Sequence, residues 1–210
     1  MTECKLFRTI LQQSRNLVLF VNNHKERSDE ELMQLMMQGN SQAFAMLYDR
    51  YSEKMIRYFY RMLGQDRDKA EDFMQDLFTK LIEKPQLFDT TKKFGTWIFS
   101  IACNMCKNEY RRLAVRKGTI NDEAKALRAK DENSENVVDY MDKKNFDQLL
   151  QVELGLLDEK HRSVFILRFQ EEMSIKEISE ALGINEGTVK SRLFYTLKKL
   201  SEKLKVFDLN

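Results

Sequence analysis

Turn-forming residues are scarce in this chain, which has 7 glycines and 1 proline among its 210 residues. They make up roughly 4% of the sequence, against about 12% in an average protein. β-Sandwiches and barrels need many glycine and proline turns, so this scarcity favours long helices joined by few loops. Hydrophobic residues make up 42% of the chain, which is enough to bury a core. We therefore expect an all-α protein of one or two domains.

Charge and cysteine content narrow the class of protein further. The 35 basic and 33 acidic side chains give a net charge of +2, which excludes a simple polycation but leaves local basic patches open. The 3 cysteines are too few for a disulfide framework, and their odd number fits a reducing compartment. The longest N-terminal apolar run, Leu17 to Val21, is too short for a signal peptide or a membrane span. These features predict a cytoplasmic protein that does not insert directly into a membrane.

The chain divides by composition into a leader, two helical units and a linker. Residues 1–27 form a basic, weakly patterned leader, and residues 28–112 carry long apolar stripes at helical spacing. Residues 113–144 are highly charged and poor in apolar residues, which predicts a flexible linker. Residues 145–206 then form a second helical unit.

Capping residues and glycines place the expected helices of the first unit. Ser28 and Glu31 form a capping box for a helix that ends at Gly39. A longer helix opens at Ser41 and closes at Gly64. A third helix starts near residue 66 and a fourth runs from about residue 94 to 113, with a loop between residues 85 and 95. The third has the apolar stripe Ala70, Phe73, Met74, Leu77, Phe78, Leu81 and Ile82.

The second unit ends in a helix-turn-helix pattern. Ser174 and Glu177 form a capping box, Gly183 provides a left-handed turn, and Asn185 caps the following helix. That helix is expected to bury Val189, Leu193, Leu197 and Leu200, and to expose Thr188, Lys190, Ser191, Arg192, Tyr195, Lys198 and Lys199. Lysine, arginine and hydroxyl groups there can contact phosphates and base edges in a major groove. The alternative is an ordinary helical hairpin with a solvated basic face.

The fourth helix of the first unit has a polar face of its own. Its members recur at helical spacing: Asn104, Lys107, Asn108, Arg111 and Arg112. Asparagine amides can bond exposed base edges while arginines neutralise phosphates, so a nucleic-acid contact is one interpretation. A solvated basic face is the other.

The polar face of the third helix is acidic, in contrast to the basic face of the fourth. Glu71, Asp72, Gln75, Asp76 and Glu83 lie opposite its apolar stripe. They predict either a solvated face or a docking surface for a basic protein.

Signals of catalysis or metal binding are weak. Cys103 and Cys106 form a C-x-x-C pair in the middle of a helix, and a zinc site needs four ligands, or three with a water. Only 2 histidines are present, and no phosphate-binding or nucleophile motif occurs. We expect a structural role for both cysteines, no metal, no cofactor and no enzymatic activity.

The order of these parts resembles that of the extracytoplasmic-function (ECF) sigma factors, the small promoter-recognition subunits of bacterial RNA polymerase. The resemblance lies in residues 43–64, 68–84, 94–112 and 157–200, and the segment GTVKSRL at 187–193 is the most specific. It implies a sigma region 2 helical bundle and a region 4 helix-turn-helix domain, joined by a linker that threads toward the polymerase channels. The implied partners are core RNA polymerase, promoter DNA and an anti-sigma factor.

The resemblance also gives each polar face an implied role in promoter recognition, melting and transcription initiation. It implies that the residues that dock on the largest polymerase subunit are Asp72, Gln75 and Asp76. Those that would bind the minus-ten element are Asn104, Lys107, Asn108, Arg111 and Arg112, and those that would line a base pocket are Leu87, Phe88 and Asp89. Those that would bind the minus-thirty-five element are Thr188, Lys190, Ser191, Arg192, Tyr195 and Lys198.

Departures from the family pattern and rival classes define the alternatives. The chain has Cys103 where the family often has arginine, Asn108 where it often has aspartate, and Leu157-Asp158 where it usually has Leu-Pro. One rival is a ligand-responsive regulator that binds duplex operator DNA without polymerase. The other is a helical adaptor that uses only the acidic third helix.

Overall fold

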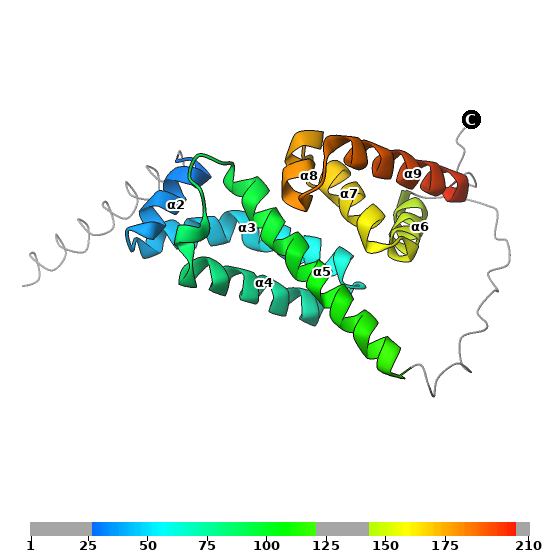
Figure 1. The fold of residues 1–210 in the computed structure, drawn as a ribbon, viewed down its shortest axis with the longest axis horizontal. Coiled ribbons are helices and arrows are strands. Elements are labelled where there is room, and N and C mark those ends of the chain that lie inside the picture. Colours follow the sequence, from blue (N-terminus) through cyan, green and yellow to red (C-terminus); the bar gives the residue numbers. More distant parts are fainter. Residues whose placement is uncertain (1–26, 121–142, 205–210) are drawn as a thin grey trace, which may run out of the picture.

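The computed structural model describes residues 27–120 and 143–204, and all regular structure within those ranges is helical (Figure 1). Residues 1–26, 121–142 and 205–210, which include nearly all of the expected leader and most of the expected linker, lie outside the described residues. The helices are α2 (Asp29–Met37), α3 (Ser41–Met62), α4 (Arg67–Glu83), the short 3-10 helix η1 (Pro85–Leu87), α5 (Phe94–Ile120), α6 (Lys143–Leu156), α7 (Glu159–Phe169), α8 (Ile175–Leu182) and α9 (Glu186–Leu204). The all-α expectation is confirmed.

Local capping chemistry sets the first helices. The predicted capping box forms in full, with Ser28 N to Glu31 Oε2 at 3.0 Å and Glu31 N to Ser28 Oγ at 3.2 Å. Gly39 adopts the left-handed conformation with φ of +86°, which side chains rarely tolerate. Helix α3 begins at Ser41 as predicted, and Asn40 caps it because its Oδ1 accepts from the amides of residues 42 and 43.

Helices α3 and α4 pack along their apolar stripes and supply most of the buried side chains of the first unit. The fully buried side chains include Leu47, Met55, Tyr58, Phe59, Met62 and Leu77. Ile82, predicted to belong to this stripe, is 54% exposed. It lies in the last turn of α4, just before Pro85, where the chain turns away through η1.

Helix α5 runs diagonally across the α3–α4 pair (Figure 1), and it packs against α8 of the second unit. Its first amide, that of Phe94, donates to Glu30 Oε1 of α2 at 2.8 Å, which satisfies an otherwise unpaired N–H at the helix start. The helix continues to Ile120, beyond the end predicted from the sequence near Leu113. The charged residues after 113 therefore begin as helix rather than as linker.

The second unit forms from α6 to α9. Asp158 caps α7 by accepting from the His161 amide at 2.9 Å, so it supplies a helix start where the family usually has proline. Leu154, Leu157, Phe165 and Leu200 form a small cluster that holds α6 against α7 and α9.

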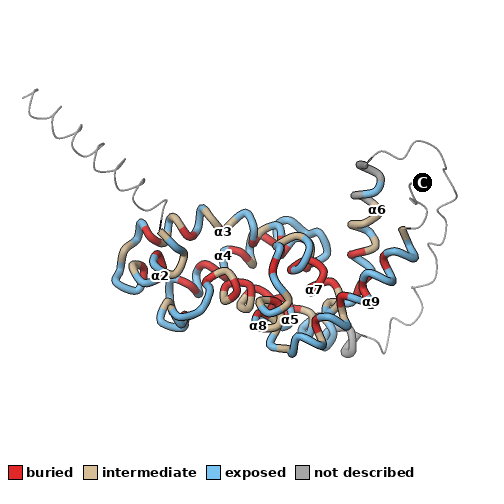
Figure 2. The backbone as a smooth tube through the Cα atoms, turned by 90° about the horizontal axis from the view of Figure 1, so that it is seen from above, coloured by how far each residue is buried: buried red, intermediate tan, exposed pale blue. Residues whose placement is uncertain are grey.

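The two units share one apolar core. A single buried cluster includes Ile98 and Cys106 of α5 together with Ile166 of α7 and Ile178 of α8. Figure 2 shows buried segments of α5 beside those of α7 and α8. The sequence predicts two separate units, because no pattern along the chain reveals which apolar faces meet. Among the described helices, none is both long enough and apolar enough to span a membrane.

Candidate nucleic-acid interface

The acidic face of α4 is open to solvent. Asp72, Gln75 and Asp76 are all exposed, while Met74 and Leu77 on the opposite side are buried. Asp66 caps the helix by accepting from the Lys69 amide at 3.0 Å. This arrangement presents two carboxylates and an amide on one rigid surface, which suits contact with a basic protein surface.

The polar face of α5 is also solvent-exposed. Asn104, Lys107, Asn108 and Arg111 are exposed. The opposite side of the helix is buried through Ala102, at 0% exposure, among others. The helix therefore holds two amides and two cations outward on a fixed backbone, as predicted from the spacing.

Arg112 is an exposed cation of α5 that is held in an ion pair. Its Nη2 lies 2.7 Å from Oε2 of Glu109, and Lys69 Nζ of α4 lies 2.7 Å from Oε1 of the same carboxylate. The hydrogen bond from Arg112 and the nearby Lys69 hold the pKa of Glu109 below its usual range. No role was predicted for Glu109 from the sequence. The available signal was a lone acid among the five bases of residues 107–117.

The three residues predicted to line a base pocket, in the loop before α5, differ in their exposure to solvent. Leu87 is 66% exposed and Asp89 is exposed. Phe88 is only 3% exposed, with its ring centroid 5.0 Å from that of Trp97 and 5.6 Å from that of Phe94. Phe88 is thus a core residue beneath the loop and not an open wall, because aromatic packing on α5 buries it.

The Asp89 carboxylate orders the same loop. It accepts from the Thr91 amide at 3.0 Å and from the Thr91 hydroxyl at 2.7 Å. These hydrogen bonds lower the pKa of Asp89. The Asp89 carboxylate is therefore hydrogen-bonded within the loop and is also exposed to solvent.

The helix-turn-helix pattern forms as predicted between α8 and α9. Ser174 and Glu177 make the capping box, and Gly183 closes α8 with φ of +64°. Asn185 Oδ1 caps α9 by accepting from the Thr188 amide at 2.7 Å and from its hydroxyl at 2.9 Å. These contacts fix the angle between the two helices.

Helix α9 exposes most of the side chains predicted to contact DNA. Lys190, Ser191, Tyr195 and Lys198 are exposed, while Thr188 and Arg192 are half-buried. These side chains lie along the first two thirds of a helix at the surface of the protein. A helix that enters a major groove has this geometry.

The buried stripe of α9 differs from the prediction at one position. Leu197 is 43% exposed, and Thr196 is buried instead at 1% exposure. The Thr196 hydroxyl donates to the Arg192 carbonyl at 2.7 Å, so burial leaves no unpaired polar group. Phe194 is 63% exposed beside Tyr195 and was not identified from the sequence.

Two side chains, Arg162 and Lys93, make polar contacts between the units near these faces. Arg162 of α7 is buried, and its Nη1 donates to the Tyr110 hydroxyl of α5 at 3.0 Å and to the Met62 carbonyl of α3 at 3.2 Å. Lys93, just before α5, pairs with Glu177 of α8 at 2.7 Å. None of these contacts was predicted, because each joins residues far apart along the chain.

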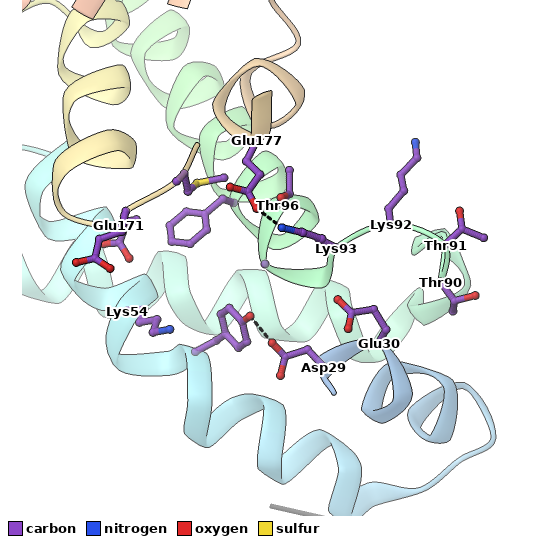
Figure 3. Close-up of a pocket in the computed structure, with 15 residues that line it drawn as sticks. Asp29, Glu30, Lys54, Thr90, Thr91, Lys92, Lys93, Thr96, Glu171 and Glu177 are labelled. Atoms are coloured by element: carbon purple, nitrogen blue, oxygen red, sulfur yellow. Dashed lines mark hydrogen bonds and ion pairs between the residues drawn. The ribbon is translucent and has the colours of Figure 1, made fainter. Parts of the chain in front are cut away.

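A cleft of about 540 Å³ lies beside the Lys93–Glu177 pair. Figure 3 shows Asp29 and Glu30 of α2, together with Lys54 of α3, facing it from the first unit. Its lining is strongly charged, and none of the residues predicted to bind DNA or polymerase lines it.

The C-x-x-C pair is buried, in keeping with the structural role expected for it. Cys103 and Cys106 are 7% and 0% exposed, and the Tyr58 hydroxyl lies 3.1 Å from Cys103 Sγ. Burial raises the pKa of the Cys103 thiol to about 12. Within the described ranges, His, Cys, Asp and Glu side chains form no cluster that could hold a metal ion.

Comparison with known proteins agrees with this architecture. Residues 47–116 match the family model for sigma-70 region 2, and residues 147–200 match that for sigma-70 region 4. The chain is 30% identical over 173 residues to the ECF RNA polymerase sigma factor SigW of Bacillus subtilis (strain 168), covering 80% of this chain and 91% of SigW. It is 30% identical over 155 residues to the ECF RNA polymerase sigma factor SigL of Mycobacterium tuberculosis (strain ATCC 25618 / H37Rv), covering 73% and 84% of the two chains.

Solved structures share the fold. The structure of CnrH in complex with the cytosolic domain of CnrY superposes with a TM-score of 0.61 at 24% identity, covering 85% of this chain and 98% of that one. The sigma factor RpoE, crystallised with the anti-sigma factor NepR from Bartonella quintana, gives 0.59 at 23% identity, covering 78% and 97%. With both family regions in order and relatives matched over most of their length, the chain belongs to the ECF family of RNA polymerase sigma factors.

Proposed function

We propose that this sigma factor binds core RNA polymerase through α4 and reads two promoter elements through α5 and α9. The observation that supports this proposal is the exposure of one acidic and two basic polar faces on three different helices of the same fold. The chain contributes binding energy, and the chemistry of RNA synthesis belongs to the polymerase. We divide it functionally into units 28–112 and 145–206, joined through residues 113–144.

The acidic face of α4 is the proposed docking surface. Asp72 and Asp76 are one helical turn apart, so both carboxylates can meet the same basic surface. Gln75 lies between them and can exchange hydrogen bonds with backbone or side chains. Charge complementarity of this kind speeds encounter and fixes orientation.

The polar face of α5 is the proposed minus-ten reader. Asn104 and Asn108 offer amides that can pair with the edges of unstacked bases, while Lys107, Arg111 and Arg112 are close enough to neutralise phosphates. The exposed loop residues Leu87 and Asp89 are candidates for contacts with an extruded base, with Phe88 supporting them from below. Selection of an extruded base makes melting depend on sequence, because the pocket offsets the few kcal/mol of unstacking.

The start of α9 is the proposed minus-thirty-five reader. Arg192 can bond guanine acceptors in a major groove, and Lys190 and Ser191 can bond phosphates. Thr188, Tyr195 and Lys198 extend the same surface along the helix.

An anti-sigma factor and a cytoplasmic location complete the proposal. The structural neighbour RpoE was crystallised with its anti-sigma factor, and the similarity in fold supports a partner of the same class here. The protein acts where polymerase and promoter DNA are found, which is the cytoplasm of a bacterial cell.

Reconstituted transcription tests the proposed function. Core polymerase with the purified chain is given a pool of genomic fragments, and transcript start sites are mapped. We expect discrete starts that share two upstream elements. Association with core polymerase without any promoter-specific transcript would refute the proposal, as would operator binding by the chain alone as a dimer, which is the behaviour of a ligand-responsive regulator.

A further inference from the structure

Glu109 is an acidic residue among the bases of residues 107–117, but it lies on the buried side of α5, and its side chain is only 5% exposed. A buried carboxylate is strongly unfavourable unless cations and hydrogen bonds compensate it. In a helix otherwise suited to contact a polyanion, this acid calls for a specific explanation.

The contacts of Glu109 tie two helices together. Lys69 Nζ of α4 lies 2.7 Å from Oε1, and Arg112 Nη2 lies 2.7 Å from Oε2 and 2.9 Å from Oε1. The side chain of Lys69 is 26% exposed and that of Arg112 is 55% exposed. The carboxylate is therefore anchored on the protected side by Lys69 and holds Arg112 on the open side.

We infer that Glu109 is a positioning residue for promoter DNA, which fixes the guanidinium of Arg112 in one orientation on the minus-ten surface. This inference rests on the proposed role of α5. Both bonds to Glu109 use the Nη2 nitrogen of Arg112, and a guanidinium carries five N–H donors in a rigid fork. The remaining donors can then point toward one phosphate or base edge without first being ordered.

The same pairing has a second, opposite effect on DNA binding. The charge of Glu109 cancels part of the local positive potential, which weakens attraction to any phosphate backbone. Orientation favours the correct DNA, while neutralisation disfavours all DNA equally. Glu109 thus raises the ratio of specific to non-specific affinity, which is the quantity that an experiment can isolate.

The test measures that ratio with holoenzyme formed from core polymerase and the full chain. One fluorescent forked probe carries a single-stranded minus-ten segment from a promoter that the wild-type holoenzyme transcribes, and a second carries the same segment scrambled. Glu109→Gln is expected to lower the cognate-to-scrambled affinity ratio about tenfold, which corresponds to about 1.4 kcal/mol. Binding to the scrambled probe is expected to stay the same or to tighten.

Variants of Arg112 separate positioning from folding. Arg112→Ala should lower the ratio as Glu109→Gln does, and the double variant should lose little more, because both changes remove one interaction. Arg112→Lys keeps the charge at an exposed site but lacks the planar fork, so it too should lower the ratio. Glu53→Gln is the matched control, since that carboxylate is 82% exposed and pairs with Arg57 at 2.7 Å on α3; it should leave the ratio unchanged.

Three results would overturn the inference while sparing the proposed function. The first is a wild-type ratio for Arg112→Lys, and the second is an additive loss in the Glu109→Gln, Arg112→Ala pair. A loss of melting temperature with an unchanged ratio would likewise reduce Glu109 to a structural role. If the wild-type holoenzyme itself fails to distinguish the two probes, the proposed role of α5 fails, and the inference fails with it.

Discussion

Replacing Tyr110 with phenylalanine should loosen the junction between the two units. The Tyr110 hydroxyl of α5 donates to the carbonyl of Met62 at the end of α3 and accepts from Arg162 Nη1 at 3.0 Å. The change keeps the ring and removes only the oxygen. It therefore tests one polar contact in an otherwise preserved core.

The magnitude follows from what remains after the change. Arg162 Nη1 still donates to the Met62 carbonyl at 3.2 Å, so neither partner is left without a hydrogen bond. A hydrogen bond to a charged group contributes about 1.5–3 kcal/mol and a neutral one about 0.5–1.5 kcal/mol. Because both partners stay paired, we expect a loss of about 1–2 kcal/mol in the free energy of unfolding.

Urea unfolding followed by tryptophan fluorescence measures this loss. Trp97 is the only tryptophan and lies on α5, half-buried near the junction with α8. Tyr60→Phe is the matched control, since Tyr60 is 37% exposed on α3, and it should change the free energy by less than about 0.5 kcal/mol. Equal effects of Tyr110→Phe and Tyr60→Phe would refute the reasoning.

A second variant checks that Arg162 is the centre of the junction. Besides its two contacts with the first unit, Arg162 donates to the carbonyls of Leu154, Gly155 and Leu157 at 2.6–2.9 Å. Arg162→Met removes all of these donors at once, three of them to carbonyls in buried contacts, so its cost should exceed that of Tyr110→Phe. An equal or smaller cost would contradict the central role.

Three further outcomes follow from the exposed faces and the buried thiols. Reversing charge in the Asp72→Arg, Asp76→Arg double variant should abolish measurable association with core polymerase in a pull-down, whereas Asp49→Arg on α3 should not. Arg192→Ala should weaken binding to the upstream element by about 1–3 kcal/mol if the arginine reads a guanine, and an equal loss on every sequence would instead indicate a phosphate contact. In a Cys4→Ser background, Cys103 should resist iodoacetamide at pH 8 in the native protein and react in urea, because burial raises the pKa of its thiol to about 12. Rapid labelling of the native protein would show that the thiol is accessible. The stability that the buried neutral thiol of Cys103 contributes should decline as pH rises from about 9 toward 12.

Capping chemistry explains why much of the fold was predictable. Ser28, Asn185 and Gly183 act on neighbours within three or four residues, so their types and spacing alone specify where helices begin and end. The same holds for the polar faces of α4 and α5, because a helix converts spacing directly into a shared surface. Those faces are exposed as predicted, and their partners remain proposals.

Burial that depends on tertiary contacts was less predictable. Leu197 was expected inside, yet Thr196 takes that place because its hydroxyl is satisfied by a carbonyl of its own helix. Phe88 was expected to line an open loop, yet Trp97 and Phe94 cover it. Hydropathy ranks residues by type and cannot register a hydroxyl that pairs within the helix or a ring that folds back under its own loop.

Glu177 shows how a local motif also sets a long-range contact. Its Oε2 accepts from the Ser174 amide at 2.9 Å and from the Ser174 hydroxyl at 2.7 Å, which completes the predicted capping box. Its Oε1 takes no part in the cap and pairs with Lys93 of the first unit at 2.7 Å.

The bond from Lys93, followed by those from Ser174, lowers the pKa of Glu177 to about 2. The carboxylate therefore stays ionised at neutral pH, and any stability it adds is present above about pH 4.5 and is lost as pH falls toward 2. Because the Lys93 side chain is 75% exposed, solvent screens the ion pair and it adds little stability. The pair orients α8 on α5, while the shared apolar core holds the two helices together.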